Sequence, residues 1–262
     1  MTAWATYPYA GSVVLVTGAG TGIGRSIARA FLEQGASVAV IGRTESALRE
    51  AVRGYPDARI LVLPTDLTAT GAVDSARDAV IHRFGRLDVV IANAGTSEAS
   101  DIDTFDDDAW ERIRSINLDA MIALVRATVP HLRETRGNFL AISSISGIRG
   151  EWGMFAYNAT KAAVNVMVQS LALDLGAAGV RVNAIAPGFT VSRLTQDRLD
   201  DAVFSERLLD RIALDRVGQP EDIARVALFV ASPDAAYLTG AIIPVDGGTS
   251  ASVGTPAPTQ RR

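Results

Sequence analysis

Short apolar runs alternate with longer amphipathic stretches along almost the whole chain. We expect strands at the apolar runs, which fall near residues 13–17, 37–41, 59–63, 87–92, 137–143, 180–186 and 241–245. Apolar positions recur with helical spacing near residues 22–34, 44–53, 70–84, 105–134, 156–178 and 220–231. Gly35 and Gly179 are well placed to end two of these helices. Strands that alternate with helices are typical of right-handed βαβ units, so the pattern predicts an α/β fold with a parallel sheet.

The first predicted strand and helix are joined by a glycine-rich turn. The run Val13-Val14-Leu15-Val16 is followed by Thr17-Gly18-Ala19-Gly20-Thr21-Gly22-Ile23-Gly24 and then by the helical pattern. Glycines allow a sharp turn and a close approach to a pyrophosphate, whose negative charge the helix N-terminus stabilises. A tight connection without a ligand is the alternative interpretation, but the strand before and the helix after favour a dinucleotide site.

A second group of residues has the side chains and spacing expected of a general acid/base site. Tyr157 and Lys161 are four residues apart, and Ser144 precedes the tyrosine by thirteen residues. Positions i and i+4 share a helix face, so the ammonium group would favour the phenolate. A unit charge about 4 Å away contributes roughly 4 kcal/mol at an effective dielectric of about 20, which predicts a lowered tyrosine pKa. An ordinary helix surface is the alternative for this spacing taken alone.

The two motifs, in this order, resemble the short-chain dehydrogenase/reductase family from about Ser12 to Gly248. Four further segments match that family: Asn93-Ala94-Gly95, Asn117, Pro187-Gly188 and Asp246-Gly247-Gly248. The resemblance implies a single-domain Rossmann fold, a doubly wound parallel sheet of seven strands with helices on both faces. It also implies reversible hydride transfer between a nicotinamide cofactor and a secondary alcohol or ketone. We expect one domain over residues 1–250 and a polar tail over 251–262.

The resemblance assigns four catalytic residues. Tyr157 would be the general acid/base, Lys161 would lower its pKa and bind the nicotinamide ribose, and Ser144 would bind the substrate oxygen. Ser143 and Ser146 compete for the last role, but the thirteen-residue offset selects Ser144. The fourth is Asn117, which would hold a proton-relaying water; a helix-bending asparagine bonded to backbone is the alternative for it.

The resemblance also implies a set of cofactor contacts, most of them just beyond predicted strands. Asn93 would in addition bridge neighbouring strands. The expected contacts with the cofactor are Thr17, Gly18, Gly20, Thr21, Gly22, Ile23, Gly24, Arg43, Asp66, Leu67, Asn93, Ala94, Gly95, Tyr157, Lys161, Pro187, Gly188, Thr190 and Ser192.

The end of the second predicted strand bears on the choice of cofactor. An acidic residue there would bind the ribose hydroxyls and repel a 2′-phosphate, but the chain has Gly42 followed by Arg43. A guanidinium pairs well with phosphate, so NADP is favoured over NAD, with Arg25 as a possible helper. Arg43 facing solvent or stacking on adenine is the alternative. Asp66 would bind the adenine amino group, unless it is a helix N-cap.

The substrate is less well defined. Residues 189–216 lose the regular pattern and are expected to form a variable lid, and the segment 149–154 is expected to line the substrate side with Gly95 and Thr96. Trp152 and Met154 would form an apolar wall there or belong to the core. Four arginines of the lid would meet an acyl carrier, or are merely solvated: Arg193, Arg198, Arg207 and Arg211. A 3-oxoacyl-thioester reductase, acting on a carrier protein or coenzyme A, is therefore the alternative substrate class.

Composition narrows the remaining functions. The net charge is −4 and cysteine is absent, so neither nucleic acid nor an anionic membrane is an expected partner, and thiolate chemistry is excluded. His82 and His131 lack metal-binding spacing, and the acidic run 98–108 resembles a helix-capping loop, so no metal is expected. A non-catalytic nucleotide-binding regulator and a serine hydrolase are weaker alternatives. The chain contains no long apolar segment, from which we expect a cytoplasmic protein, and the resemblance implies a homotetramer, with a dimer second.

Overall fold

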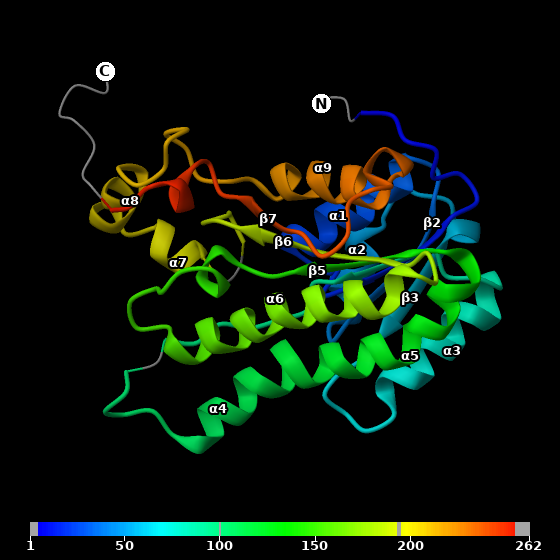
Figure 1. The fold of residues 1–262 in the computed structure, drawn as a ribbon, viewed down its shortest axis with the longest axis horizontal. Helices are drawn as coiled ribbons and strands as arrows, with labels where there is room; N and C mark the ends of the chain where they lie inside the picture. The colour runs from blue at the N-terminus through cyan, green and yellow to red at the C-terminus, as the bar shows by residue number, and fades with distance from the viewer. Residues whose placement is uncertain (1–4, 100, 193–194, 255–262) are drawn as a thin grey trace.

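One parallel sheet organises the chain, and residues 5–99, 101–192 and 195–254 are described by a computed structural model. Within these residues the sheet has seven strands in the order β3-β2-β1-β4-β5-β6-β7. Figure 1 shows the strands crossing the middle of the molecule, with helices above and below them. The strands are β1 (Val13–Thr17), β2 (Ser37–Gly42), β3 (Ile60–Pro64), β4 (Val89–Ala92), β5 (Asn138–Ile142), β6 (Arg181–Pro187) and β7 (Ile242–Val245). The strand order reverses between β1 and β4, which is the switch point where ligands of such sheets bind.

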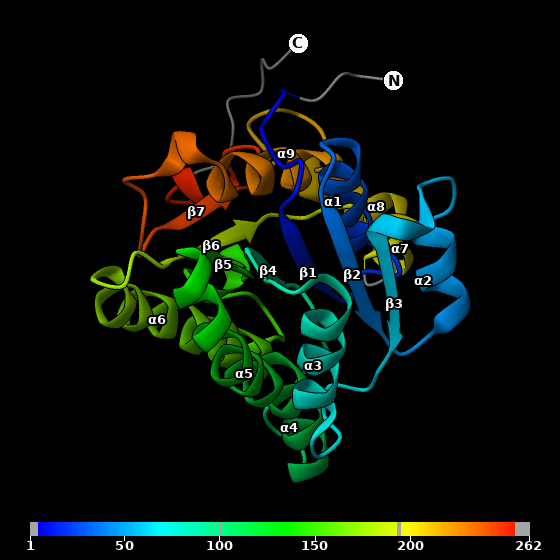
Figure 2. The ribbon, with the colours of Figure 1, turned by 90° about the vertical axis from the view of Figure 1, so that its right-hand side faces the viewer.

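Helices cover both faces of the sheet (Figure 2). They are α1 (Gly22–Glu33), α2 (Glu45–Ala51), α3 (Ala72–Phe84), α4 (Asp107–Arg114), α5 (Ala120–Thr135), α6 (Phe155–Gly176), α7 (Gln196–Leu199), α8 (Ala202–Leu209) and α9 (Pro220–Ala231). Helices α1 and α9 pack on one face, while α3, α5 and α6 pack on the other. The predicted doubly wound Rossmann fold is therefore confirmed.

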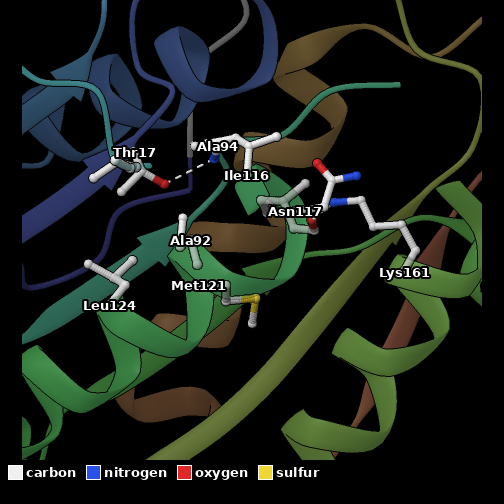
Figure 3. Close-up of a pocket in the computed structure, with 11 residues that line it drawn as sticks. Thr17, Ala92, Ala94, Ile116, Asn117, Met121, Leu124 and Lys161 are labelled. Atoms are coloured by element: carbon white, nitrogen blue, oxygen red, sulfur yellow. Dashed lines mark hydrogen bonds between the residues drawn. The ribbon is translucent and has the colours of Figure 1, made fainter. Parts of the chain in front are cut away.

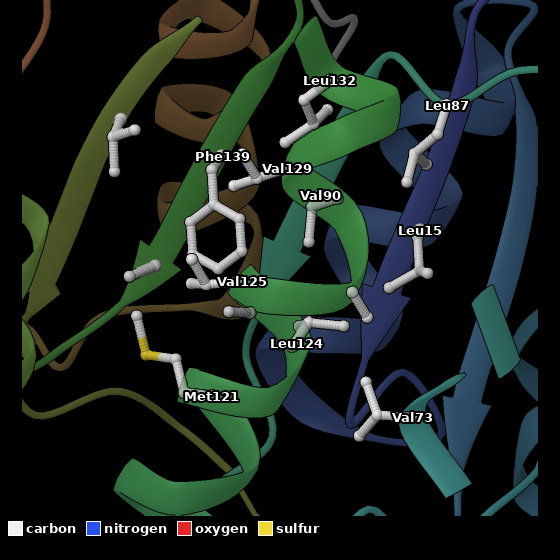
Figure 4. Packing of buried hydrophobic residues seen from close by; sticks show 14 of the residues in the cluster. Leu15, Val73, Leu87, Val90, Met121, Leu124, Val125, Val129, Leu132 and Phe139 are labelled. Carbon is white, nitrogen blue, oxygen red and sulfur yellow. The ribbon is translucent and has the colours of Figure 1, made fainter. Parts of the chain in front are cut away.

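The strands read as unbroken apolar runs because both of their faces are buried. Val14 and Val16 of β1 belong to the core beneath α1 and α9, whereas Val13 and Leu15 belong to the core beneath α5. Successive side chains of a strand point to opposite faces, so one strand contributes to two cores. Figure 4 shows the second core, in which Leu15 lies with side chains of α5 and with Phe139 of β5.

The sequence predicted one helix over residues 105–134, but the helix in the structure is interrupted. A π-helical turn over Ser115–Asp119 separates α4 from α5 and contains Asn117. The amide of Asn117 is hydrogen-bonded to the backbone of Thr96, which lies outside the helix. A π-helical turn adds a residue to the helical repeat and is frequent at functional sites. Apolar periodicity does not reveal such an insertion, because the residues on either side keep their helical spacing.

The remaining expectations about elements are met in part. Gly35 and Gly179 have φ angles of +90° and +78° and follow the ends of α1 and α6, as predicted. The irregular segment 189–216 contains the short helices α7 and α8. The predicted tail lies mostly outside the described residues, which end at position 254, and the single-domain boundary at 250 stays a prediction. In the part of the chain that the structure describes, we find no helix of the length and apolarity that a membrane span requires.

Candidate active site

The glycine-rich turn is packed so closely that side chains would not fit in it. A Cβ atom on Gly24 would overlap the carbonyl oxygen of Gly18, and one on Gly18 would lie 2.8 Å from Nδ2 of Asn93. Gly18 and Gly22 also have φ angles of +64° and +52°, which favour glycine. The turn leads directly into the N-terminus of α1, where backbone N–H groups point outward. It is thus an open cradle of backbone donors at the switch point of the sheet.

Asn93 ties this turn to β4, as predicted. Its Nδ2 donates to the carbonyl oxygens of Thr17 at 2.9 Å and Gly18 at 3.2 Å. In return, Oγ1 of Thr17 accepts hydrogen bonds from the backbone of Asn93 and Ala94, each at 2.9 Å. Figure 3 shows the bond from Ala94. The Thr17 side chain is buried, so its hydroxyl holds β1 to β4. The hydroxyl and the carbonyl of Thr17 are thus both bonded within the protein, and its contact with a cofactor stays a prediction.

The ends of β2 and β3 place Arg43 and Asp66 on the same edge of the sheet. Both side chains are exposed. The carboxylate of Asp66 accepts hydrogen bonds from the Thr68 backbone at 3.0 Å and the Thr68 hydroxyl at 2.8 Å, which lower the pKa of Asp66, with a smaller effect of the Arg43 charge. Asp66 does not cap α3, whose N-cap is Gly71, so the alternative role weighed for it is wrong. Leu67 beside it is buried.

The three central residues of the acid/base motif converge beyond β5. Ser144 ends the strand region and begins a 3₁₀ turn, and its Oγ accepts a hydrogen bond from the Ser146 backbone at 3.1 Å. Tyr157 and Lys161 lie on the first two turns of α6. Burial raises the pKa of Tyr157 to about 12, although a hydrogen bond with the Ser144 side chain acts to lower it and the charge of Glu151 to raise it.

The expected lowering of the Tyr157 pKa by Lys161 does not occur. The Lys161 amine donates to the carbonyl oxygen of Ile142 at 2.9 Å, and its Nζ lies 5.8 Å from the centre of the tyrosine ring. Burial lowers the pKa of Lys161 to about 8. Burial penalises the charged form of each group and is the largest cause of both shifts.

The other two serines of this segment are engaged elsewhere. The Ser143 hydroxyl donates to Oδ1 of Asn165 at 2.6 Å, and the Ser146 hydroxyl donates to Oε2 of Glu151 at 2.7 Å. Ser144 is the serine whose side chain interacts with Tyr157. The geometry therefore agrees with the choice of Ser144 from its spacing.

Asn117 and Lys161 line the same small cavity. Oδ1 of Asn117 accepts from the Thr96 backbone at 2.8 Å, while Nδ2 donates to the Thr96 carbonyl at 2.9 Å and to Oγ1 of Thr160 at 3.2 Å. The cavity has a volume of about 10 Å³, which is close to what one water molecule needs (Figure 3). It is lined by Thr17, Leu67, Ala92, Ala94, Ile116, Asn117, Ala120, Met121, Leu124, Ile142 and Lys161. The two roles weighed for Asn117, binding to the backbone and holding a water, are thus compatible. Its amide binds the backbone of Thr96, and the adjoining cavity has room for a water molecule.

The segment after β6 closes the crevice from the other side. A Cβ atom on Gly188 would lie 2.6 Å from Cβ of Asp246, which explains why glycine stands there. The buried Thr190 donates its hydroxyl to the Gly188 carbonyl at 3.0 Å. Ser192 lies against the glycine turn, 3.4 Å from where a Cβ of Gly22 would be. Both of the hydroxyls expected near a nicotinamide are bonded within this segment: that of Ser192 lies 3.1 Å from the Thr195 hydroxyl, and that of Thr190 binds the backbone.

Sequence reasoning missed a contact between the substrate loop and the lid. Glu151 forms an ion pair with Arg198 of α7, with 3.2 Å between Oε1 and Nη1. These residues are 47 positions apart, and nothing in the local pattern predicts their pairing. Trp152 is 99% exposed, so of the two alternatives weighed for it, packing in the core is wrong.

Other expectations about charged segments can be compared with the structure. Asp106 caps α4, since its side chain accepts from the Ala109 backbone at 2.6 Å, which agrees with a helix-capping loop. The described residues contain no group of three or more His, Asp or Glu that could hold a metal ion. Of the lid arginines, Arg211 binds the Gly254 carbonyl at 2.9 Å, Arg207 is exposed, and Arg193 lies outside the described residues.

A glycine cradle at the switch point, with an acid/base cluster beyond the next strands, defines a Rossmann-type oxidoreductase. Residues 18–250 match a family model described as enoyl-(acyl carrier protein) reductase. The chain belongs to the short-chain dehydrogenase/reductase family and is an NAD(P)-dependent oxidoreductase acting on alcohols and ketones.

Three similar proteins illustrate the range of this family. The chain is 35% identical over 244 residues to meso-2,3-butanediol dehydrogenase from Serratia marcescens, covering 93% of this chain and 96% of that protein. A 3-ketoacyl-(acyl-carrier-protein) reductase from Brucella melitensis, complexed with NADH, superimposes with a TM-score of 0.86 at 29% identity, over 92% of this chain and 99% of that one. The Pseudomonas aeruginosa RhlG/NADP active-site complex superimposes with a TM-score of 0.87 at 31% identity, over 93% of this chain and 99% of that one.

Proposed function

We propose that the protein catalyses reversible reduction of a ketone to a secondary alcohol at the cluster of Ser144, Tyr157, Lys161 and Asn117. The observation that carries this proposal is that Asn117 and Lys161 line one cavity together with Thr17 of the glycine cradle, while Tyr157 lies one turn before Lys161 on α6, where Ser144 acts on its pKa. A non-catalytic nucleotide-binding regulator would not require these four groups together. The weaker hydrolase alternative lacks support, because Ser144 is paired with a phenol and not with a histidine.

Tyr157 is the proton donor in the direction of reduction. With a pKa raised to about 12 it carries its proton at neutral pH, yet it is a stronger acid than the alcohol that forms when it protonates the alkoxide. The Tyr157 hydroxyl gives its proton to that oxygen and takes it back during oxidation. The nicotinamide, when bound, supplies or accepts the hydride at the same carbon.

Ser144, Lys161 and Asn117 support this transfer. The Ser144 hydroxyl donates a hydrogen bond to the substrate oxygen and stabilises its developing negative charge. The Lys161 amine, fixed by the Ile142 carbonyl, is a buried cation that stabilises the phenolate left after proton transfer. Asn117 and Lys161 border a cavity of about 10 Å³, and a water held there would return a proton to the tyrosine.

The cradle fits a dinucleotide cofactor. Its glycines leave the backbone N–H groups and the N-terminus of α1 open to a pyrophosphate. The remaining predicted contacts, from Asp66 and Asn93 to Gly188 and Ser192, lie at the carboxyl ends of neighbouring strands. Exposed Arg43 at the end of β2, preceded by Gly42 and not by an acidic residue, favours NADP over NAD.

The substrate class is best tested with a panel of ketones and secondary alcohols, each assayed with NADPH and NADH. We expect turnover of several panel members and a higher kcat/KM for NADPH. A 3-oxoacyl thioester belongs in the panel, because the Brucella melitensis relative is named a 3-ketoacyl-(acyl-carrier-protein) reductase. Binding of nucleotide without turnover of any member would favour the regulator.

A homotetramer with paired α5 and α6 helices is part of the proposal. Ile122 on α5 and Phe155, Val166 and Leu173 on α6 are apolar and exposed, which is consistent with a covered face. Light scattering coupled to size exclusion would distinguish a tetramer from a dimer. The cytoplasmic location and the expected lack of nucleic-acid and membrane partners stay predictions.

A further inference from the structure

Glu151 joins the catalytic loop to the lid. Its Oε2 accepts the hydrogen bond of the buried Ser146 hydroxyl at 2.7 Å, and its Oε1 lies 3.2 Å from Nη1 of Arg198. We call Ser146, Glu151 and Arg198 the Glu151 clamp. The side chains of Glu151 and Arg198 are 32% and 47% exposed, so the clamp lies at the boundary between the site and solvent.

Aromatic rings hold the other side of the clamp. The guanidinium carbon of Arg198 lies 4.3 Å from the ring centre of Phe204 on α8 and 5.2 Å from that of Phe189, which follows Gly188. Guanidinium groups stack favourably on aromatic faces while their edges pair with carboxylates. The charge of Arg198 is therefore taken up by Glu151 and two rings, and it is not free to receive an anionic substrate.

The carboxylate of Glu151 lies close to the catalytic groups. It precedes Tyr157 by six residues and binds Ser146, whose backbone in turn binds Oγ of Ser144. Its charge is also close enough to raise the pKa of Tyr157. A negative charge on the substrate near the reacting carbon would thus meet this carboxylate, and Arg198, which is already paired with Glu151, is not free to compensate it.

We propose that the Glu151 clamp is a specificity filter that disfavours substrates with a negative charge near the reacting carbonyl and selects neutral ketones and secondary alcohols. The filter rests on the proposed function. Like charges placed together reject a partner more effectively than neutral contacts do, because the buried side of the site screens them poorly.

The filter is tested with two substrates that share one reacting carbon. Ethyl acetoacetate is neutral and acetoacetate is an anion. Consumption of NADPH or NADH gives kcat/KM for each of them. If the enzyme reduces another oxo acid ester of the panel faster, that ester and its free acid replace this pair. Wild type is expected to favour the ester. Glu151→Gln should lower the ester-to-acid ratio by roughly tenfold, chiefly by raising kcat/KM for the acid. Glu151→Asp should keep the ratio, and Glu206→Gln, which removes an exposed carboxylate of α8, should leave it within twofold.

Hydrogen exchange tests the clamp without turnover. Arg198→Met should speed amide exchange in α8 at least fivefold and leave β1 unchanged, since the link to Glu151 is lost while most of the packing stays. Unchanged exchange, or a Glu151→Gln variant that slows or speeds both substrates equally, would overturn the filter. A wild type that reduces no panel ketone with either nucleotide contradicts the proposed function, whereas one that reduces acetoacetate as well as its ester contradicts the filter alone.

Discussion

Asn117 is bonded through both ends of its side-chain amide to the backbone of Thr96. Oδ1 accepts from the Thr96 N–H at 2.8 Å and Nδ2 donates to the Thr96 carbonyl at 2.9 Å. This pair fixes the π-helical turn to the segment after β4 and places Asn117 beside the cavity that Lys161 also lines. A Cβ on Gly95 would lie 3.0 Å from Oδ1 of Asn117, so the neighbouring glycine is needed for this approach.

Asn117→Ala should both destabilise the protein and slow its turnover. The Thr96 backbone groups would lose their partners in a partly buried place, which costs about 1–3 kcal/mol of unfolding free energy. Turnover should fall as well, because the wall of the cavity is lost. Denaturant unfolding and steady-state kinetics measure the two effects, and Ser75→Ala, at an exposed position of α3 that does not line the cavity, is the control. Wild-type stability in Asn117→Ala would contradict the role of the pair.

Tyr157→Phe should abolish most turnover and leave nucleotide binding intact. The change removes the hydroxyl and keeps the ring, so the loss corresponds to general acid catalysis, about 10²- to 10⁴-fold in kcat. Quenching of the intrinsic tryptophan fluorescence by NADPH reports binding separately from the rate. A variant that turns over at the wild-type rate would refute the assignment of Tyr157.

Ser144→Ala should mainly lower kcat, whereas Ser143→Ala should mainly lower the stability of the fold. Loss of the Ser144 hydroxyl removes the group that interacts with Tyr157, so kcat should fall by about 10²-fold with little change in stability. Loss of the Ser143 hydroxyl leaves Oδ1 of buried Asn165 without this donor, so stability should fall by about 1–3 kcal/mol while kcat changes less. If the two variants lose activity equally, the serine cannot be chosen by its contact with Tyr157.

The strands and the glycine turn could be predicted because their signals are local. Strands buried on both faces are apolar throughout, and close backbone packing at Gly18 and Gly24 leaves glycine as the only residue that fits. The spacing of Tyr157 and Lys161 likewise predicts that they share a helix.

What could not be predicted depends on tertiary burial and on distant pairs. The pKa of Tyr157 is set mainly by burial, which is invisible in a four-residue spacing. The π-helical turn at Asn117 leaves the apolar periodicity on either side intact. Glu151 and Arg198 meet only because the lid folds back over the catalytic loop.

Lys161→Met should change how stability depends on pH. Burial lowers the lysine pKa from 10.5 to about 8, so between these values the unfolded chain binds more protons and the free energy of unfolding rises with pH. Below pH 8 the full cost of a buried cation is present. Lys161→Met should therefore be more stable relative to wild type at pH 7 than at pH 10.5, by about 1–3 kcal/mol.

Denaturant titrations of both proteins at several pH values from 7 to 10.5 measure this gap. The lost hydrogen bond to the Ile142 carbonyl lowers the stability of the variant to a similar extent throughout, so the change with pH isolates the charge. The pKa of Tyr157 is raised to about 12, so this tyrosine stays protonated in the folded protein across this range. Its titration in the unfolded chain affects wild type and variant alike and does not change the gap between them. A gap that is constant with pH would mean that Lys161 titrates near its ordinary value.

Gly24→Ala should abolish dinucleotide binding, because its Cβ would overlap the carbonyl oxygen of Gly18 and force the cradle open. A displaced Gly18 would also strain the bonds of Asn93 to the turn, so stability should fall by about 1–3 kcal/mol. Gly176→Ala is the matched control, since a Cβ there meets no atom within 4 Å at the end of α6 and should be neutral or slightly stabilising. Calorimetric titration with NADPH and NADH measures binding, and a Gly24→Ala protein that binds either nucleotide with wild-type affinity would show that the turn is a connection and not the cofactor site.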